Sequence, residues 1–137
     1  FGIAFENNSG GFEVRNTYTK LCLGLKDVTL VRAGSEPTSE IAVFEGFFDF
    51  LTFRNLENKL NSGCDCLILN STAMLFKAEQ ILQEYPKILL FLDNDPNGKS
   101  VALKIRNDYK NVEDCSLIYH GYKDLNEWLI KTKSLSQ

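Results

Sequence analysis

Short, unbroken apolar segments restrict the fold of this chain more than any other feature of its sequence. Four of them recur after Thr38, at residues 41–44, 66–69, 88–92 and 115–119. None alternates polar with apolar residues, as a strand with one solvent-exposed face would. Continuous apolar strands are typical of a parallel sheet, because helices cover both of its faces. We therefore predict four mainly parallel strands.

Each of these segments is followed by a stretch with helical spacing. Apolar residues there recur every three or four positions, at Phe50, Phe53, Leu56 and Leu60, then at Leu75, Ala78, Leu82 and Tyr85, then at Val101, Ile105 and Tyr109, and finally at Leu125, Trp128 and Leu129. The alternation predicts an α/β fold, in which a four-stranded sheet with right-handed crossovers is flanked by helices. Asp124 and Glu127 have the spacing of a capping box at the start of the last helix.

The first 36 residues follow a different pattern. Short strand-like pieces are separated there by turn-forming residues such as Asn7-Asn8-Ser9-Gly10-Gly11. We expect a small antiparallel β appendage at residues 1–36, a linker around 33–39, and one main domain at 37–137. Because the sequence starts with Phe1 rather than methionine, we interpret the chain as a fragment of a longer protein.

Composition and cysteine spacing exclude several classes of protein. The net charge of -3 disfavours nucleic-acid binding over the whole surface, although a local basic face stays compatible with it. The longest apolar runs are too short to span a membrane, and there is no signal-peptide pattern. Cys64 and Cys66 are one residue apart, closer than paired zinc ligands usually are, so we expect reduced thiols, no zinc and a cytoplasmic location.

Acidic residues follow three of the four predicted strands. Glu45 follows the first, Asp93 and Asp95 the third, and Asp124 lies beyond the fourth. Parallel strands place their carboxyl ends at one edge of a sheet, where function collects. Carboxylates that meet there repel one another, and a hard divalent cation such as Mg²⁺ removes that cost.

Three other interpretations of residues 93–98 are weaker. An EF-hand loop would require glutamate at its twelfth position, where this chain has Lys104. A phosphatase of the Asp-x-Asp type usually carries these acids after its first strand. An Asp/Asn-rich turn that caps a helix would explain one aspartate but not Glu45.

Taken together, these residues resemble the Toprim domain, the catalytic module of bacterial-type DNA primases, topoisomerases and some nucleases. The resemblance rests on Glu45-Gly46-x-x-Asp49, on the small-residue turn at 70–73 and on Asp93-x-Asp95-x-x-Gly98. It is nearest to primase-like proteins of mobile genetic elements. Asp124 matches their last acidic motif, but Asn126 replaces its second aspartate.

The resemblance implies a Toprim/Rossmann-like sheet, a divalent ion and a set of functional residues. It implies Mg²⁺ or Mn²⁺ as cofactor and a nucleotidyltransferase that makes RNA primers from nucleoside triphosphates on single-stranded DNA, with helicase or mobilisation proteins as partners. The catalytic residues would be Glu45, Asp93 and Asp95, the metal ligands Glu45, Asp49, Asp93, Asp95 and Asp124, and the nucleotide or nucleic-acid contacts Arg15, Lys26 and Lys99.

Two other functions remain open at this stage. A Toprim nuclease would cleave DNA phosphodiesters with the same acids. A Toprim-like module without turnover would bind nucleic acid or replication partners. A topoisomerase is disfavoured, because no domain with a catalytic tyrosine accompanies these motifs. The activity of the isolated fragment is also left open.

Overall fold

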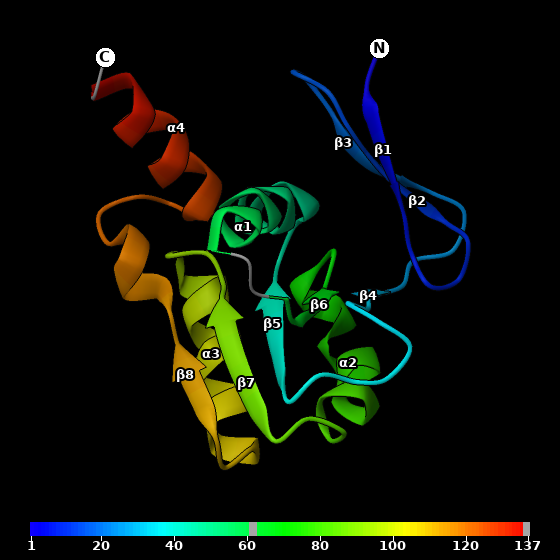
Figure 1. The fold of residues 1–137 in the computed structure, drawn as a ribbon. Coiled ribbons are helices and arrows are strands. Elements are labelled where there is room, and N and C mark those ends of the chain that lie inside the picture. The colour runs from blue at the N-terminus through cyan, green and yellow to red at the C-terminus, as the bar shows by residue number, and fades with distance from the viewer. Residues whose placement is uncertain (61–62, 136–137) are drawn as a thin grey trace.

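The computed structural model describes residues 1–60 and 63–135, and these residues form two sheets with helices packed around the larger one (Figure 1). The larger sheet has five strands in the order β4-β6-β5-β7-β8. The smaller sheet has three strands in the order β1-β2-β3. No helix of the described residues is both long enough and apolar enough to cross a bilayer.

The larger sheet confirms the predicted fold class. Its parallel strands are β5 (Glu40–Phe44), β6 (Asp65–Ile68), β7 (Lys87–Phe91) and β8 (Val112–Asp114). A fifth strand, β4 (Thr29–Val31), pairs antiparallel with β6, with Thr29 opposite Ile68 and Val31 opposite Cys66. We had expected residues 29–31 in the appendage. They join the main sheet instead, and Val28 beside them is almost fully buried in its core.

Helices cover both faces of the larger sheet, as the unbroken apolar strands require. On one face α2 (Leu75–Leu82) and α3 (Pro96–Asp108) pack on alternate strand residues such as Ile41 and Val43. On the other face α1 (Phe47–Leu60) and α4 (Leu125–Leu135) pack near Ala42 and Phe44. The two cores therefore use the two sets of alternating residues from the same strands.

The prediction of a strand at residues 115–119 is wrong. The fourth parallel strand is β8, which ends at Asp114, and residues Ser116–Tyr119 form the 3-10 helix η2. The Asp114 carboxylate accepts a hydrogen bond from the Ser116 backbone N–H at 3.0 Å, which turns the chain out of the sheet. Of this apolar run, Tyr119 is buried, whereas Leu117 is 79% exposed. His120 consequently lies beyond a helical turn rather than at a strand end.

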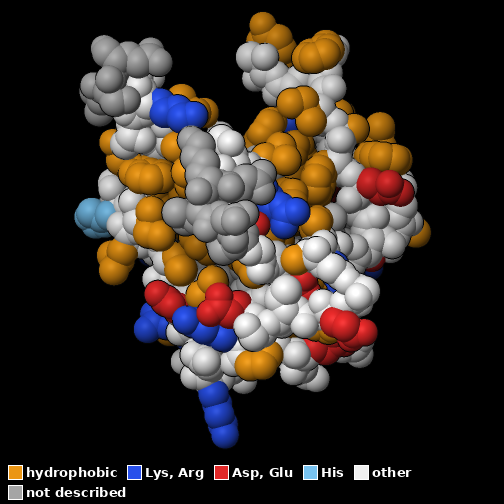
Figure 2. All heavy atoms as spheres, viewed as in Figure 1, with side chains coloured by type: hydrophobic (Ala, Val, Ile, Leu, Met, Phe, Trp, Pro, Cys, Tyr) orange, Lys and Arg blue, Asp and Glu red, His pale blue; other side chains and the backbone are white. Residues whose placement is uncertain are grey.

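The smaller sheet forms a separate wall beside the start of α1 (Figure 1). It consists of β1 (Ile3–Glu6), β2 (Phe12–Arg15) and β3 (Lys20–Leu23), all antiparallel, as expected for the appendage. The ring of Phe5 stacks on Phe47 at 5.2 Å between centroids, which joins this sheet to α1. Its opposite face carries exposed apolar side chains such as Phe12 and Leu23, and hydrophobic side chains gather over this sheet in Figure 2.

Candidate metal centre

A cleft of about 320 Å³ lies at the carboxyl ends of the parallel strands. Loops that follow β5, β6 and β7, the start of α4 and the smaller sheet all contribute to it. Its lining residues are Arg15, Lys20, Glu45, Gly46, Phe48, Asp49, Asn70, Ser71, Thr72, Asp93, Asn97, Lys123, Asp124 and Asn126. The motifs that the sequence placed at strand ends therefore meet in one concave site.

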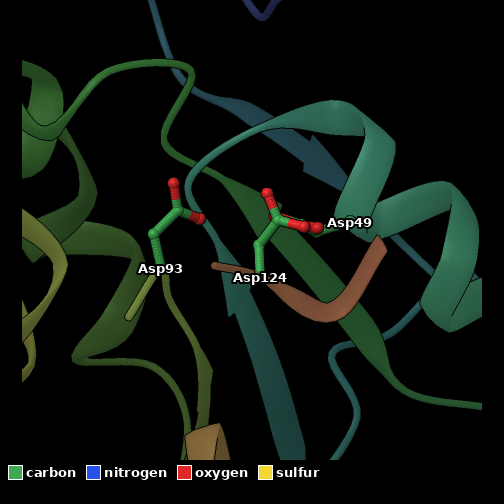
Figure 3. A group of neighbouring side chains, drawn as sticks. All are labelled: Asp49, Asp93 and Asp124. Atoms are coloured by element: carbon green, nitrogen blue, oxygen red, sulfur yellow. The ribbon is translucent and has the colours of Figure 1, made fainter. Parts of the chain in front are cut away.

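Three carboxylates converge in this cleft. Asp49, Asp93 and Asp124 each offer an oxygen atom, and these atoms all lie within 4.8 Å of one another. Asp49 comes from the first turn of α1, Asp93 follows β7, and Asp124 precedes α4; Figure 3 shows their side chains grouped together. Carboxylates from three separate elements at this spacing can hold one metal ion between them.

Hydrogen bonds fix the two carboxylates on the α1 and α4 side. Asp49 Oδ1 accepts from the Asn126 backbone N–H at 3.0 Å, and Asp124 Oδ1 accepts from the Glu127 N–H at 2.8 Å. Glu127 Oε2 accepts from the Lys123 N–H at 2.6 Å rather than from the Asp124 N–H, so only the Asp124 half of the predicted capping box forms. Within the described residues, the Oδ2 atoms of Asp49 and Asp124 have no hydrogen bond.

Glu45 lines the same cleft and lies beside Asp93. It follows β5 immediately, and its Oε1 accepts a hydrogen bond from the Asp93 backbone N–H at 3.2 Å. Gly98 packs against this pair, because a Cβ there would clash with the Asp93 carbonyl oxygen and lie 2.6 Å from Glu45 Oε1. The glycine of the Asp-x-Asp-x-x-Gly motif is thus required by close packing around Glu45.

Asp95 has a different position from its partner in the motif. Its Oδ1 accepts a hydrogen bond from the Gly98 N–H at 2.7 Å, so it is the N-cap of α3. It neither lines the cleft nor belongs to the group of three carboxylates. Its charge still contributes to raising the pKa of Asp93 and of Glu45.

Burial and mutual repulsion make the charged state of this site unfavourable. Burial, followed by the charge of Asp124, raises the pKa of Asp49 to about 8 and that of Asp93 to about 6. Burial and the charge of Asp93 raise the pKa of Glu45 to about 7. A hard divalent cation offsets this repulsion, and an all-oxygen donor set suits Mg²⁺ or Mn²⁺. The residues therefore fit the cofactor that the sequence suggested.

Basic side chains of the smaller sheet face the acidic group across the cleft. Arg15 is held over the rings of Phe47 and Phe48, at 5.4 and 5.6 Å from their centroids. Lys20 lies opposite Arg15 in the β2–β3 register, and burial together with the charge of Arg15 lowers its pKa. Lys20 was not among the predicted site residues. The cross-strand pairing of a hairpin at residues 12–23 would have placed it beside Arg15.

The other two predicted basic contacts lie in hollows next to the cleft. Lys26 lines a hollow of about 200 Å³ that shares Lys20, Asn70 and Ser71 with the cleft. Lys99 lines another of about 540 Å³, which shares Lys123 with the cleft. Lys123 was also missed, although it directly precedes Asp124 in the sequence.

Asn126 occupies the position where the resemblance expects a second acid. Its Oδ1 accepts a hydrogen bond from the Thr52 hydroxyl at 3.0 Å, and its backbone N–H binds Asp49. The residue therefore joins α4 to α1 in the wall of the cleft, which it also lines. The structure brings together three aspartates and Glu45 without it.

Family comparison agrees with this geometry. A family model described as Toprim-like matches residues 42–129, which include every acidic residue of the cleft. A second model, described as a domain of unknown function (DUF8464), matches residues 1–24. No curated protein matches the chain.

Solved structures show the same fold. The primase fragment of the bacteriophage T7 primase-helicase protein superimposes with a TM-score of 0.71 at 17% identity, covering 96% of this chain and 57% of the fragment. A second match, with a TM-score of 0.68 at 16% identity, covers 98% of this chain and 72% of the other. It comes from a bacteriophage T7 lagging-strand DNA polymerase interacting with primase domains of two gp4 subunits bound to an RNA/DNA hybrid and dTTP.

Proposed function

Because the chain belongs to the Toprim-like family, we propose that residues 37–137 are the catalytic Toprim domain of a DNA primase-like protein. Residues 1–36, of which β4 joins the larger sheet, would be what this chain contains of the N-terminal primase subdomain. The reaction is metal-dependent nucleotidyl transfer, which makes RNA primers from nucleoside triphosphates on single-stranded DNA. The observation that carries the proposal is the convergence of Asp49, Asp93 and Asp124 beside Glu45, opposite Arg15 and Lys20.

The fold supports a primase more than another Toprim enzyme. One similar structure is a primase fragment and another contains primase domains, and the matches cover the smaller sheet of this chain together with the larger one. One of these structures belongs to a primase-helicase protein, so a helicase is the partner we propose. None of the comparisons names a mobilisation protein, and that partner stays a prediction from the sequence.

In this proposal Asp49, Asp93 and Asp124 hold Mg²⁺ or Mn²⁺. When bound, the ion supplies positive charge for the phosphate oxygens of the reacting nucleotide. Asp95, predicted as a further ligand, contributes instead by capping α3 and so fixing the chain after Asp93. Glu45 lies beside Asp93 rather than among the three metal-binding aspartates, because its Oε1 already accepts a hydrogen bond from the Asp93 N–H.

The chain's own residues bind and orient the substrates. Glu45 Oε2 accepts the proton of the attacking hydroxyl group while Oε1 keeps the side chain in place. Arg15 and Lys20 bind triphosphate oxygens from the opposite wall, and the rings of Phe47 and Phe48 restrict the guanidinium beforehand. Lys26, in the adjoining hollow, contacts the template backbone.

Primer synthesis and DNA nicking, assayed in parallel on the intact protein, test this function. We expect Asp93→Asn to lower the rate of primer synthesis at least about a hundredfold, since the ion that would contact the transferring phosphate loses a carboxylate ligand. Asp108→Asn is the matched control, because Asp108 is an exposed acid paired with Lys104 at the far end of α3. Glu45→Gln should lose turnover but keep Mn²⁺ affinity within a few-fold.

Each other outcome assigns a different function. Nicking that depends on Asp93, without primer synthesis, would identify a nuclease. DNA affinity that needs no metal and survives the loss of both Asp49 and Asp93, without turnover, would identify a binding module. An unchanged response to Mg²⁺ in the Asp49→Asn/Asp93→Asn double variant would exclude the metal centre.

A further inference from the structure

We propose that the hollow between the start of α3 and the loop after η2 binds the phosphodiester backbone of a nucleic-acid strand that passes the carboxylates. We call it the η2 hollow; the residues that carry the argument are Asn94, Lys99, Ser116, His120, Tyr122 and Lys123. The inference rests on the proposed function and adds to it a second contact region for the strand.

The charges of the η2 hollow are suited to a polyanion. None of its lining residues within the described part of the chain is acidic, although the chain as a whole has a net charge of -3. Lys99 and Lys123 are exposed, and neither has an ion pair among the described residues. By contrast, Lys104 of α3 and Lys131 of α4 are paired with nearby acids. The two unpaired ammonium groups are free to bind phosphate.

Hydrogen bonds from Asn94 hold the wall of this hollow in place. Its Nδ2 donates to the carbonyl oxygens of Tyr119 at 3.2 Å and Tyr122 at 3.1 Å. Its backbone N–H donates to the carbonyl oxygen of Lys123 at 2.7 Å. Asn94 lies between Asp93 and Asp95 in the sequence. Asn94 fixes this loop and directly follows Asp93 in the chain. The position of the hollow relative to Asp93 is therefore set by the protein itself and does not require bound nucleic acid.

The η2 hollow continues the catalytic cleft in one direction. Lys123 lines both, and its charge lowers the pKa of Asp93 across that boundary. In another direction the cleft continues into the hollow that contains Lys26. Lysines thus flank the acidic group in two adjoining hollows, a distribution that suits a strand of several nucleotides better than one nucleotide. Tyr122 and His120 add two rings on which a base can stack.

Oligonucleotides of increasing length test this inference on the intact protein in Mg²⁺. Binding of single-stranded DNA from 4 to 16 nucleotides, followed by fluorescence anisotropy, is compared between wild type, Lys99→Ala and Arg106→Ala. Arg106 is the matched control, because it is an exposed cation of α3 that does not line the η2 hollow. The removed charge is the same in both variants.

We expect Lys99→Ala to weaken binding of the longer strands about two- to fivefold and to leave the shortest unchanged. The slope of log affinity against log salt concentration should fall by about 0.7, the value for one lost phosphate contact on a single strand. Arg106→Ala should change neither quantity.

Three results would overturn the inference. Equal losses for Lys99→Ala and Arg106→Ala would show a general charge effect. A higher KM for nucleoside triphosphate with unchanged strand affinity would assign the hollow to the free nucleotide. Wild-type affinity that does not rise with strand length would exclude a second contact region while leaving primer synthesis, and with it the proposed function, intact.

Discussion

Replacing Asp49 by asparagine is expected to stabilise the metal-free protein at alkaline pH. Asp49 is only 5% exposed, and burial together with the charge of Asp124 raises its pKa to about 8. Asparagine has the same size and keeps an Oδ1 that can accept from the Asn126 N–H. The substitution therefore removes a charge and preserves the hydrogen bond.

The pKa of Asp49 determines the sign and size of the effect. An unfolded chain loses this proton near pH 3.8, but the folded protein keeps it until about pH 8. Between these values the folded state binds more protons, so the free energy of unfolding falls as the pH rises. At about 1.4 kcal/mol for each tenfold change in the dissociation constant, the full effect is about 5–6 kcal/mol. Coupling to Asp93 and Asp124 and relaxation of the site reduce this to about 2–3 kcal/mol.

Thermal unfolding in EDTA, measured between pH 4 and pH 8.5, gives the comparison. At pH 4 the wild type and Asp49→Asn should have nearly the same Tm, because the wild-type carboxyl is protonated in the folded state. The Tm of the variant should rise above that of the wild type with increasing pH, by about 6–10 °C at the upper limit. Mg²⁺ at pH 8 should then stabilise the wild type more than the variant.

A pH-independent loss of stability in Asp49→Asn would contradict this prediction, since it would show that the carboxylate's hydrogen bond matters more than its charge. The exposed acid Asp108 provides the control: Asp108→Asn should show no comparable rise in Tm toward alkaline pH. Equal stabilisation of the wild type and Asp49→Asn by Mg²⁺ would separately place the ion away from Asp49.

Three further substitutions examine the walls of the site. Gly98→Ala should lower the free energy of unfolding in urea by about 2–4 kcal/mol, because its Cβ would meet the Asp93 carbonyl, whereas Gly34→Ala, with no atom within 4 Å, should be nearly neutral. Asn94→Ala should weaken Mn²⁺ binding about fivefold or more in calorimetry, since it releases the loop before Asp124; an unchanged affinity would mean that α4 alone positions that loop. Asn126→Asp should raise Mn²⁺ affinity several-fold and lower the metal-free Tm at pH 8, and no change in either would show that this position is remote from the ion.

Most of the larger sheet could be predicted from the sequence, because its strands are buried on both faces. Apolar residues then follow one another without alternation, and this pattern separates β5, β6 and β7 from the helices between them. The same reasoning was wrong at 115–119, where an apolar run follows the short edge strand β8. The Ser116 N–H donates to Asp114 there, and the chain makes a helical turn that leaves Leu117 exposed.

The acidic site was only partly predictable. Strand-end position predicted Glu45 and Asp93, and the resemblance to Toprim domains predicted Asp49 and Asp124. The sequence treated Asp93 and Asp95 alike, but the Asp95 carboxylate binds the Gly98 N–H of its own helix. Lys20 and Lys123 were missed because surface lysines look alike in a sequence until their neighbours are known.

The alternation of strands and helices between residues 40 and 108 could be read from the sequence, since short-range periodicity encodes which residues of each element are buried. The sequence also determined that carboxylates would lie at one edge of the sheet. Which of them share a site depends on long-range packing, because Asp49, Asp93 and Asp124 come together where α1 and α4 pack near the end of β7. Asp95 and Asp124 both cap a helix through Oδ1, at 2.7 and 2.8 Å, but packing places only Asp124 within 4.8 Å of Asp49 and Asp93.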